Sequence, residues 1–229
     1  MALDHSQTYR DGRLRNLPHR IRLKSLVRAC DRQIVDAGSK RYADFGCSNG
    51  YLTHLLAERY RFAQATGYEF NAENLAKAQR DFNSVKFAYL NLNIDSLDEQ
   101  FDFATCLETL EHVGDVRHAL KLMHQALRPG GKLMITVPIE IGPIGLAKFL
   151  TKMAIGYDVR ELTDEPGGRW RYFKGILDGR ISEFRPADRT GWGTHFGFDY
   201  RTVDAVLDQM QVNYTVENRA TTRFYIVYA

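Results

Sequence analysis

The stretch YADFGCSNGYLT, residues 42–53, decides the fold expected for this chain. It passes from an apolar, strand-like run into Gly46 and Gly50 and then into a segment with helical spacing. Glycines at such a turn usually allow something to approach the backbone closely. In the dinucleotide pattern G-x-G-x-x-G that partner is a pyrophosphate at the helix N-terminus. This turn has no G-x-G pair, and Asp44 precedes its first glycine, so it suits an ammonium group better than a phosphate.

Strand-like and helical segments alternate from residue 41 to residue 138. Strands are expected at 41–46, 64–70, 85–92, 101–108 and 132–138. Helices are expected from Pro18 to Gly38 and at 50–60, 71–82 and 115–131. Asn71 is placed to cap the third of these helices, and Pro129 and Gly130 to close the fourth. The alternation predicts an α/β fold with a doubly wound, mostly parallel sheet.

The end of the chain adds an antiparallel element. A helix is expected at 199–210, followed by strand-like runs at 212–218 and 223–229 with a short turn between them. Seven strands that end in a hairpin differ from a plain dinucleotide fold. We expect one domain with four parts: a basic segment and helix at 1–40, a core at 41–138, an inserted lid at 139–198, and the last helix and hairpin at 199–229.

Composition narrows the class of protein. Apolar residues make up 44% of the 229 residues, charged residues 26%, and the net charge is +3, which is ordinary for a globular domain and does not suggest a nucleic-acid partner. The three cysteines lack metal-type spacing and the start lacks a secretory signal, so we expect a cytoplasmic protein without a metal. No apolar run is long enough to span a membrane.

The acid at the end of the second strand identifies a ligand. Glu69 stands where a carboxylate can accept hydrogen bonds from ribose hydroxyls. Ribose recognition without a pyrophosphate cradle points to a cationic nucleoside. S-adenosylmethionine has a ribose and an α-ammonium group and carries no phosphate.

Residues 40–140 resemble the class I S-adenosylmethionine-dependent methyltransferases. Four blocks in this order carry the resemblance: DFGCSNG, TGYEFNAENL, FDFATCLETLEHV and ALRPGGKLMITVP. It implies a Rossmann-like methyltransferase fold and an enzyme that converts S-adenosylmethionine to S-adenosylhomocysteine. The resemblance places the following residues around the cofactor: Asp44, Gly46, Cys47, Ser48, Asn49, Gly50, Glu69, Phe70, Asn91, Leu92 and Leu107.

One of these positions departs from the family pattern. The family often has an acid near the adenine amino group after the third strand, and this chain has Asn91 there. The side-chain carbonyl of an asparagine can still accept a hydrogen bond from that amino group. Asp95 is the alternative if the register differs.

Methyl transfer needs an aligned acceptor and, for a hydroxyl, removal of a proton. We expect His195, in the lid, to be the general base, with His112 and Glu140 as further candidates. Structural roles remain open for all three. Tyr172 and Trp192 are candidates for an acceptor wall, although lid aromatics also form small cores.

Residues 143–155 have the pattern of an amphipathic helix with interleaved lysines. This helix either packs on the domain or makes a peripheral contact with the inner face of the membrane. The function expected is methyl transfer to an oxygen, less readily a nitrogen, of a small molecule, sugar or lipid-linked intermediate. A nicotinamide-dependent oxidoreductase and an inactive methyltransferase-like binding protein are the alternatives. Because LETLEH follows the fourth strand instead of an N/D-P-P-Y/F loop, no nucleic-acid substrate is expected.

Overall fold

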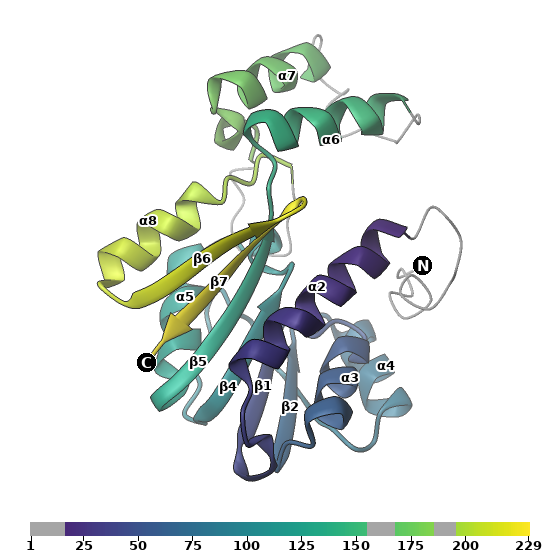
Figure 1. Cartoon of the computed structure of the whole chain (residues 1–229), viewed down its shortest axis with the longest axis vertical. Helices are drawn as coiled ribbons and strands as arrows, with labels where there is room; N and C mark the ends of the chain where they lie inside the picture. The colour runs from purple at the N-terminus through teal and green to yellow at the C-terminus, as the bar shows by residue number, and fades with distance from the viewer. Residues whose placement is uncertain (1–16, 155–167, 186–195) are drawn as a thin grey trace.

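The computed structural model describes residues 17–154, 168–185 and 196–229. Within these residues one sheet has the strand order β3-β2-β1-β4-β5-β7-β6 (Figure 1). Its strands are β1 (Arg41–Phe45), β2 (Gln64–Glu69), β3 (Lys86–Tyr89), β4 (Phe101–Leu107), β5 (Leu127–Pro138), β6 (Asn213–Arg219) and β7 (Thr222–Tyr228). Neighbours from β3 to β5 pair in parallel, whereas β7 runs antiparallel to both β5 and β6. The doubly wound sheet with a C-terminal hairpin is confirmed.

Alternating side chains give the sheet two apolar faces. In β5, Met134 packs with α2 (Leu17–Gln33) and α3 (Tyr51–Tyr60), whereas Leu133 and Ile135 pack on the opposite face with α5 (Val116–Gln125) and α8 (Arg201–Met210). A further helix, α4 (Ala72–Asp81), packs beside β3. The result is a three-layer domain, which leaves the carboxyl ends of the parallel strands as the edge open to a ligand.

The two helix-end signals read from the sequence gave different results. Asn71 caps α4 as predicted, because its Oδ1 accepts a hydrogen bond from the backbone N–H of Asn74 at 3.0 Å. The expected closure of the α5 helix at Pro129 and Gly130 is wrong, since α5 ends at Gln125 and this segment begins β5. The backbone N–H of Gly130 donates to the carbonyl of Ala229, so the segment is held by the C-terminus.

The lid segment (residues 139–198) begins directly after β5, at the carboxyl edge of the sheet. Its described helices, α6 (Gly142–Ala154) and α7 (Gly168–Asp178), lie together beyond that edge (Figure 1). They share a small apolar core of their own, formed by Ile141, Phe149, Tyr172, Ile176, Ile181 and Phe196. The two helices therefore have an apolar cluster of their own beyond the ligand edge, whereas Phe198 at the end of the lid segment packs in the core of the sheet.

Candidate functional site

The turn after β1 is built by alternating backbone conformations. Gly46 and Gly50 both have φ +76°, and Ser48 between them has φ +50°. The backbone N–H groups of Gly46 and Cys47 both donate to the carbonyl of Tyr68, which fixes the turn to β2. A Cβ on Gly46 would lie 2.3 Å from the Thr109 side chain. A Cβ on Gly50 would likewise lie 2.7 Å from the ring of Phe87, so the glycines first of all allow the protein's own side chains to pack against the turn.

Asp44 faces the interior of the domain. Its Oδ2 accepts a hydrogen bond from Thr53 Oγ1 at 2.6 Å, and its Oδ1 accepts one from Thr105 Oγ1 at 2.7 Å. The side chain is almost fully buried, and burial raises the pKa of Asp44 to about 6 although both hydroxyl hydrogen bonds oppose the rise. Each oxygen of Asp44 thus accepts one hydrogen bond from a threonine inside the domain, and a role for Asp44 toward an ammonium group stays a prediction.

Glu69 is the acid that reaches the ligand edge. Its Oε2 accepts from the backbone N–H of Ser48 at 2.8 Å, and its Oε1 accepts from that of Asn71 at 2.7 Å. Burial raises the pKa of Glu69, and the backbone hydrogen bonds oppose this rise. A carboxylate has about four acceptor sites, so each oxygen keeps one for a further donor. The Glu69 side chain thus has a fixed direction and can still accept further hydrogen bonds.

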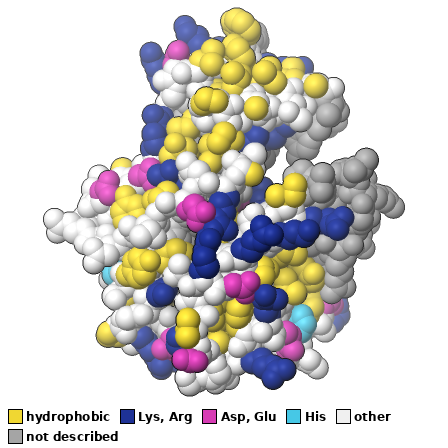
Figure 2. Space-filling view, in the orientation of Figure 1, with side chains coloured by type: hydrophobic (Ala, Val, Ile, Leu, Met, Phe, Trp, Pro, Cys, Tyr) yellow, Lys and Arg dark blue, Asp and Glu magenta, His cyan; other side chains and the backbone are white. Residues whose placement is uncertain are grey.

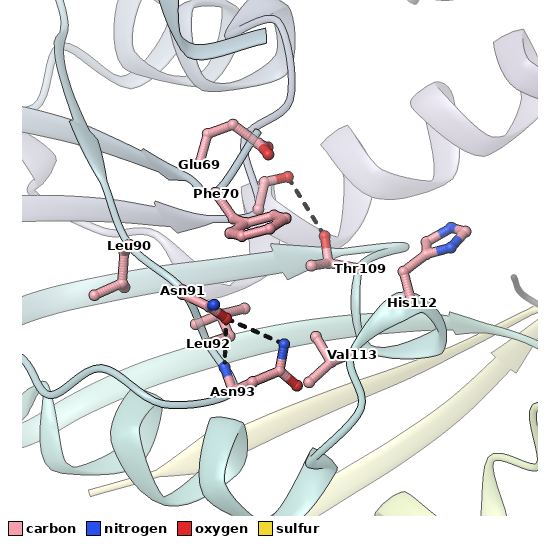
Figure 3. Close-up of a pocket in the computed structure, with 10 residues that line it drawn as sticks. Glu69, Phe70, Leu90, Asn91, Leu92, Asn93, Thr109, His112 and Val113 are labelled. Carbon is pink, nitrogen blue, oxygen red and sulfur yellow. Dashed lines mark hydrogen bonds between the residues drawn. The ribbon is translucent and has the colours of Figure 1, made fainter. Parts of the chain in front are cut away.

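A pocket of about 340 Å3 opens beside Glu69. Figure 3 shows the ring of Phe70 at its centre, with the segment after β3 on one side and the segment around η3 (Leu110–His112) on the other. The pocket is lined by Gly46, Glu69, Phe70, Leu90, Asn91, Leu92, Asn93, Thr109, His112 and Val113. It combines a fixed acid at one point with apolar and aromatic walls elsewhere, which is typical of a small-ligand site.

The asparagine predicted at this pocket is present, but its carbonyl is engaged. Asn91 Oδ1 accepts from the backbone N–H of Asn93 at 3.0 Å and from its Nδ2 at 3.1 Å. Asn93 Oδ1 in turn accepts from the backbone N–H groups of Gly114 and Asp115. Asp95, the alternative residue, accepts from the backbone N–H of Asn91 and is not part of the lining. Asn93 therefore joins the two walls of the pocket, a role that sequence patterns did not indicate.

Two further pockets adjoin each other on the far side of the β4 end, and we call them together the α2 groove. Their volumes are about 340 and 580 Å3, and both are lined by Arg22 and Phe224. The groove lining is completed by Ile21, Leu23, Ser25, Leu26, Leu52, Leu107, Glu108, Thr136, Arg219, Ala220, Thr221 and Thr222. Lys and Arg side chains form a band across this face, where α2 passes the β6–β7 turn (Figure 2).

The groove contains an ion pair at its inner end. Arg22 Nη1 lies 3.0 Å from Glu108 Oε2, with the two side chains 28% and 18% exposed. Glu108 has φ +51°, which is uncommon for a residue other than glycine. Its backbone N–H donates to the carbonyl of Thr136 at 3.0 Å and to Thr136 Oγ1 at 3.1 Å. The sequence resemblance had placed Glu108 with Leu107 on the far side of the cofactor, but it indicated neither Arg22 nor the ion pair, because the contact joins residues far apart in the chain.

The candidate catalytic and acceptor residues are dispersed. His112 lines the pocket beside Glu69. Glu140 is buried at the start of the lid and is ion-paired with Lys148 of α6. Tyr172 is 2% exposed and packs within the lid core against Phe149 and Phe196. Trp192 and His195 lie outside the described residues.

The described part of the chain has neither a metal cluster nor a membrane span. No group of three or more His, Cys, Asp or Glu side chains in 17–154, 168–185 and 196–229 is arranged to hold a metal ion. Over the same residues, no helix has the length and apolar character needed to cross a bilayer.

A family model described as a methyltransferase domain matches residues 7–203 of the chain. The chain belongs to the methyltransferase-domain family. This confirms the family expected from the four sequence blocks, and with it the enzyme class and S-adenosylmethionine as the cofactor.

Similar proteins of known name fall in the same class. The chain is 36% identical over 103 residues to the ubiquinone biosynthesis O-methyltransferase of Idiomarina loihiensis, which covers 42% of each protein. It is 32% identical over 108 residues to the protein of that name from Pseudomonas entomophila, covering 44% of this chain and 46% of the other. The chain thus spans less than half of the length of these curated relatives.

Solved structures show the same fold. An S-adenosylmethionine-dependent methyltransferase from Mesorhizobium loti aligns with a TM-score of 0.58 at 16% identity, over 88% of this chain and 96% of the other. The magnesium protoporphyrin IX methyltransferase of Synechocystis PCC 6803 aligns with a TM-score of 0.61 at 14% identity, over 97% and 91%. The Rossmann-like methyltransferase architecture is therefore confirmed.

Of the residues expected around the cofactor, several lie together at the pocket beside Glu69. The fixed Glu69 carboxylate retains acceptor sites, and Phe70 and Leu92 give the pocket an apolar surface. Gly46 lies at the same pocket, and Leu107 lies at the inner end of the α2 groove. Cys47 instead packs into the apolar cluster behind the turn, with Ala78 and Phe87.

Proposed function

We propose that this methyltransferase transfers the methyl group of S-adenosylmethionine to a hydroxyl oxygen of a small, partly apolar acceptor. The observation that carries the donor assignment is Glu69, which is fixed by two backbone N–H groups and directed into the pocket formed with Phe70 and Asn91. An oxygen acceptor is supported by the relatives, which are named O-methyltransferases.

On the donor side, the bound cofactor supplies a methyl group that its sulfonium charge has already activated. The protein has to hold the nucleoside in place and exclude water. Glu69 binds the ribose hydroxyls, and Phe70, Leu90 and Leu92 enclose the adenine. Asn91 is held by Asn93, so it provides a fixed polar rim.

On the acceptor side, we assign the α2 groove. The relatives' printed names concern ubiquinone biosynthesis, and the groove contains an apolar wall of Leu23, Leu26 and Phe224, so a hydroxylated ring with an apolar substituent is the acceptor class that we propose. This proposal selects one class among the small-molecule, sugar and lipid-linked acceptors that the sequence left open.

For the proton, His195 stays the proposed general base, with His112 as the candidate among the described residues because it lines the donor pocket. Glu140 is already paired with Lys148, and we therefore assign it to holding α6 against the end of β5. Tyr172 is assigned to the lid core and Trp192 remains a proposed acceptor contact.

A peripheral membrane contact through residues 143–155 also remains a proposal. Leu150 of α6 is 51% exposed, and Trp170 and Leu177 of α7 are also exposed. We expect the wild-type protein to co-float with phosphatidylcholine–phosphatidylglycerol vesicles. We expect the Leu150→Glu variant not to co-float with them.

Isothermal titration calorimetry tests the donor assignment. S-adenosylhomocysteine is expected to bind, and NADH is not. Glu69→Gln is expected to weaken S-adenosylhomocysteine binding by about 10- to 100-fold, since hydrogen bonds to a charged group contribute about 1.5–3 kcal/mol. The exposed Glu58→Gln is the matched control and should leave affinity unchanged.

The same titration separates the alternatives. NADH binding without S-adenosylhomocysteine binding would establish the oxidoreductase, and binding of neither would favour an inactive partner protein. A panel of catechols, hydroxylated quinols, sugars and amines then tests the acceptor, with product read as a mass increase of one methyl group. Methylation only of amines would overturn the oxygen assignment.

A further inference from the structure

We propose that Arg185 is a positioning residue that couples the lid to the pocket beside Glu69, so that the bound methyl donor and the lid stabilise each other. This inference rests on the proposed function, because it requires the donor to bind in that pocket. Arg185 lies outside the four sequence blocks that resemble the family, so it belongs to the part of the chain that the motifs do not assign.

Arg185 connects the lid with a wall of the pocket, 72 residues away in the chain. Its Nη2 donates a hydrogen bond to the carbonyl of Val113 at 2.7 Å. Val113 is buried and lines the pocket together with His112, on the side of η3 (Figure 3). Because the donor is a charged guanidinium, this hydrogen bond is stronger than one between two neutral groups. The lid thus directly contacts a residue of the pocket that we assign to the methyl donor.

The pocket wall at residues 110–115 is held from two sides. On the side of β3, Asn93 Oδ1 accepts hydrogen bonds from two successive backbone N–H groups of this segment, at 2.8 and 2.9 Å. On the side of the lid, Arg185 binds the carbonyl of Val113. The wall itself contains one short 3₁₀ turn, η3, whose hydrogen-bond geometry is poorer than that of an α-helix. We infer that the two side chains determine where the wall lies.

The backbone of Arg185 is packed against the lid core. Arg185 directly follows η5 (Ile181–Phe184), and the ring of Phe184 lies 5.3 Å from that of Tyr172 in α7. On the other side, a Cβ on Gly197 would lie 2.6 Å from the backbone nitrogen of Arg185, so the returning chain passes directly against it. Close-packed groups transmit a displacement to their neighbours. A shift of the lid core therefore displaces Arg185.

The side chain of Arg185 extends from the lid toward the sheet. It is partly buried, and its guanidinium lies 5.2 Å from the ring centroid of Phe198, which packs in the core of the sheet. A planar guanidinium stacks favourably on an aromatic face, and this contact limits the directions in which it can point. A shift of the lid thus either breaks the hydrogen bond to Val113 or moves the wall of the pocket.

Thermodynamic linkage makes this dependence reciprocal. A donor that contacts Val113 and His112 fixes the wall of the pocket, and the fixed wall favours the lid position in which Arg185 reaches the carbonyl. The lid in that position raises the affinity for the donor by the same factor. The donor therefore orders the lid before an acceptor enters.

Hydrogen exchange read by mass spectrometry, with and without S-adenosylhomocysteine, tests the coupling. In the wild type, the ligand should slow exchange in residues 110–115. It should also slow exchange in residues 168–185 by about fivefold or more, although none of these lid residues lines the pocket. In Arg185→Gln, the slowing in 110–115 should persist, and the slowing in 168–185 should fall below about twofold. The affinity for S-adenosylhomocysteine, measured by calorimetry, should fall by the same factor of about five.

Two further variants separate coupling from a structural role. Arg185→Lys keeps a charged donor for the carbonyl of Val113 and should restore the slowing in 168–185. Arg180→Gln removes the same charge from an exposed position of the lid and should behave as the wild type. Ligand-free exchange of 168–185 in Arg185→Gln should stay slower than in the unfolded chain. If it reached the unfolded rate, Arg185 would be needed for the lid to fold, and the inference would be wrong.

The remaining outcomes distinguish this inference from the proposed function. If S-adenosylhomocysteine binds the wild type and slows exchange in 110–115 but not in 168–185, the coupling does not exist and the proposed function stands. Slowing of 168–185 in Arg185→Gln to the same extent as in the wild type would also overturn the role of Arg185. If the wild type neither binds S-adenosylhomocysteine nor shows slower exchange in 110–115, the proposed function itself fails.

Discussion

Replacing Asp44 by asparagine is expected to stabilise the ligand-free protein at pH 8. The raised pKa means that the folded protein holds a proton on Asp44 more tightly than the unfolded chain does. Stability from this group is therefore fully present below pH 3.8 and is lost as the pH rises through about 6. At about 1.4 kcal/mol per pH unit, the difference amounts to about 3 kcal/mol above pH 7.

Asparagine resembles the protonated side chain and removes this cost. Its Oδ1 can accept from Thr53 Oγ1, and its Nδ2 can donate to Thr105 Oγ1. The Thr105 hydroxyl then remains free to donate to the carbonyl of Ala43, 3.5 Å away, or to Tyr42. Thr53→Val should act in the opposite direction at pH 8, because it removes a donor from the ionised carboxylate.

Urea unfolding followed by far-ultraviolet circular dichroism measures the effect. The free energy of unfolding of Asp44→Asn, minus that of the wild type, should be about 2–3 kcal/mol at pH 8, should fall to about 1 kcal/mol at pH 4.5 and should approach zero below pH 3.8. A variant that is less stable than the wild type at pH 8, by an amount that does not change with pH, would refute the claim that this carboxylate is buried at a cost.

Three further predictions concern packing and reactivity. Gly46→Ala should lower the free energy of unfolding by about 3 kcal/mol or more, because the residue has φ +76° and its new Cβ would clash with the Thr109 side chain. Gly130→Ala has a similar φ of +79° but open space around the new Cβ, so it should lower the free energy of unfolding by only about 1–2 kcal/mol. Equal losses in the two variants would mean that the clash with Thr109 does not contribute. Burial raises the pKa of Cys30 to about 12 and those of Cys47 and Cys106 well above the ordinary value, so a thiol reagent at pH 8 should leave all three unmodified until guanidinium is added. Tyr172→Ala should increase hydrogen exchange in α6 and α7 and leave β1 and β4 protected, because the lid core is separate; increased exchange throughout the sheet would contradict this.

Local patterns were enough to predict the fold and to name several residues that line the pocket beside Glu69. The strand-to-helix turn at Gly46 and the acid at Glu69 lie within one βαβ unit, where spacing along the chain determines the position in space. The cap at Asn71 was predicted for the same reason. The start of β5 was not, because the Pro129–Gly130 signal for a helix end is overridden by hydrogen bonds to the C-terminal strand.

Contacts between residues from distant segments of the chain could not be predicted from the sequence. The direction of Asp44 depends on Thr53 and Thr105, which lie on α3 and β4. Arg22 meets Glu108 across 86 residues only because α2 crosses the sheet near the end of β4. Tyr172 could be named as an aromatic residue of the lid, but only the packing of α6 on α7 shows that it belongs to a core.

The strand order also divides the domain into parts that can change independently. One side, from β3 to β4, carries the pocket beside Glu69, and the other side, from β5 to β6, is joined to α6, α7 and the β6–β7 turn. We therefore expect that exchanges in α6, α7 and the β6–β7 turn that keep Arg185 in place leave the shape of the Glu69 pocket unchanged. For protein engineering, these segments are the ones to vary, and the turn at Gly46, Arg185 and the core residue Phe198 are the ones to keep.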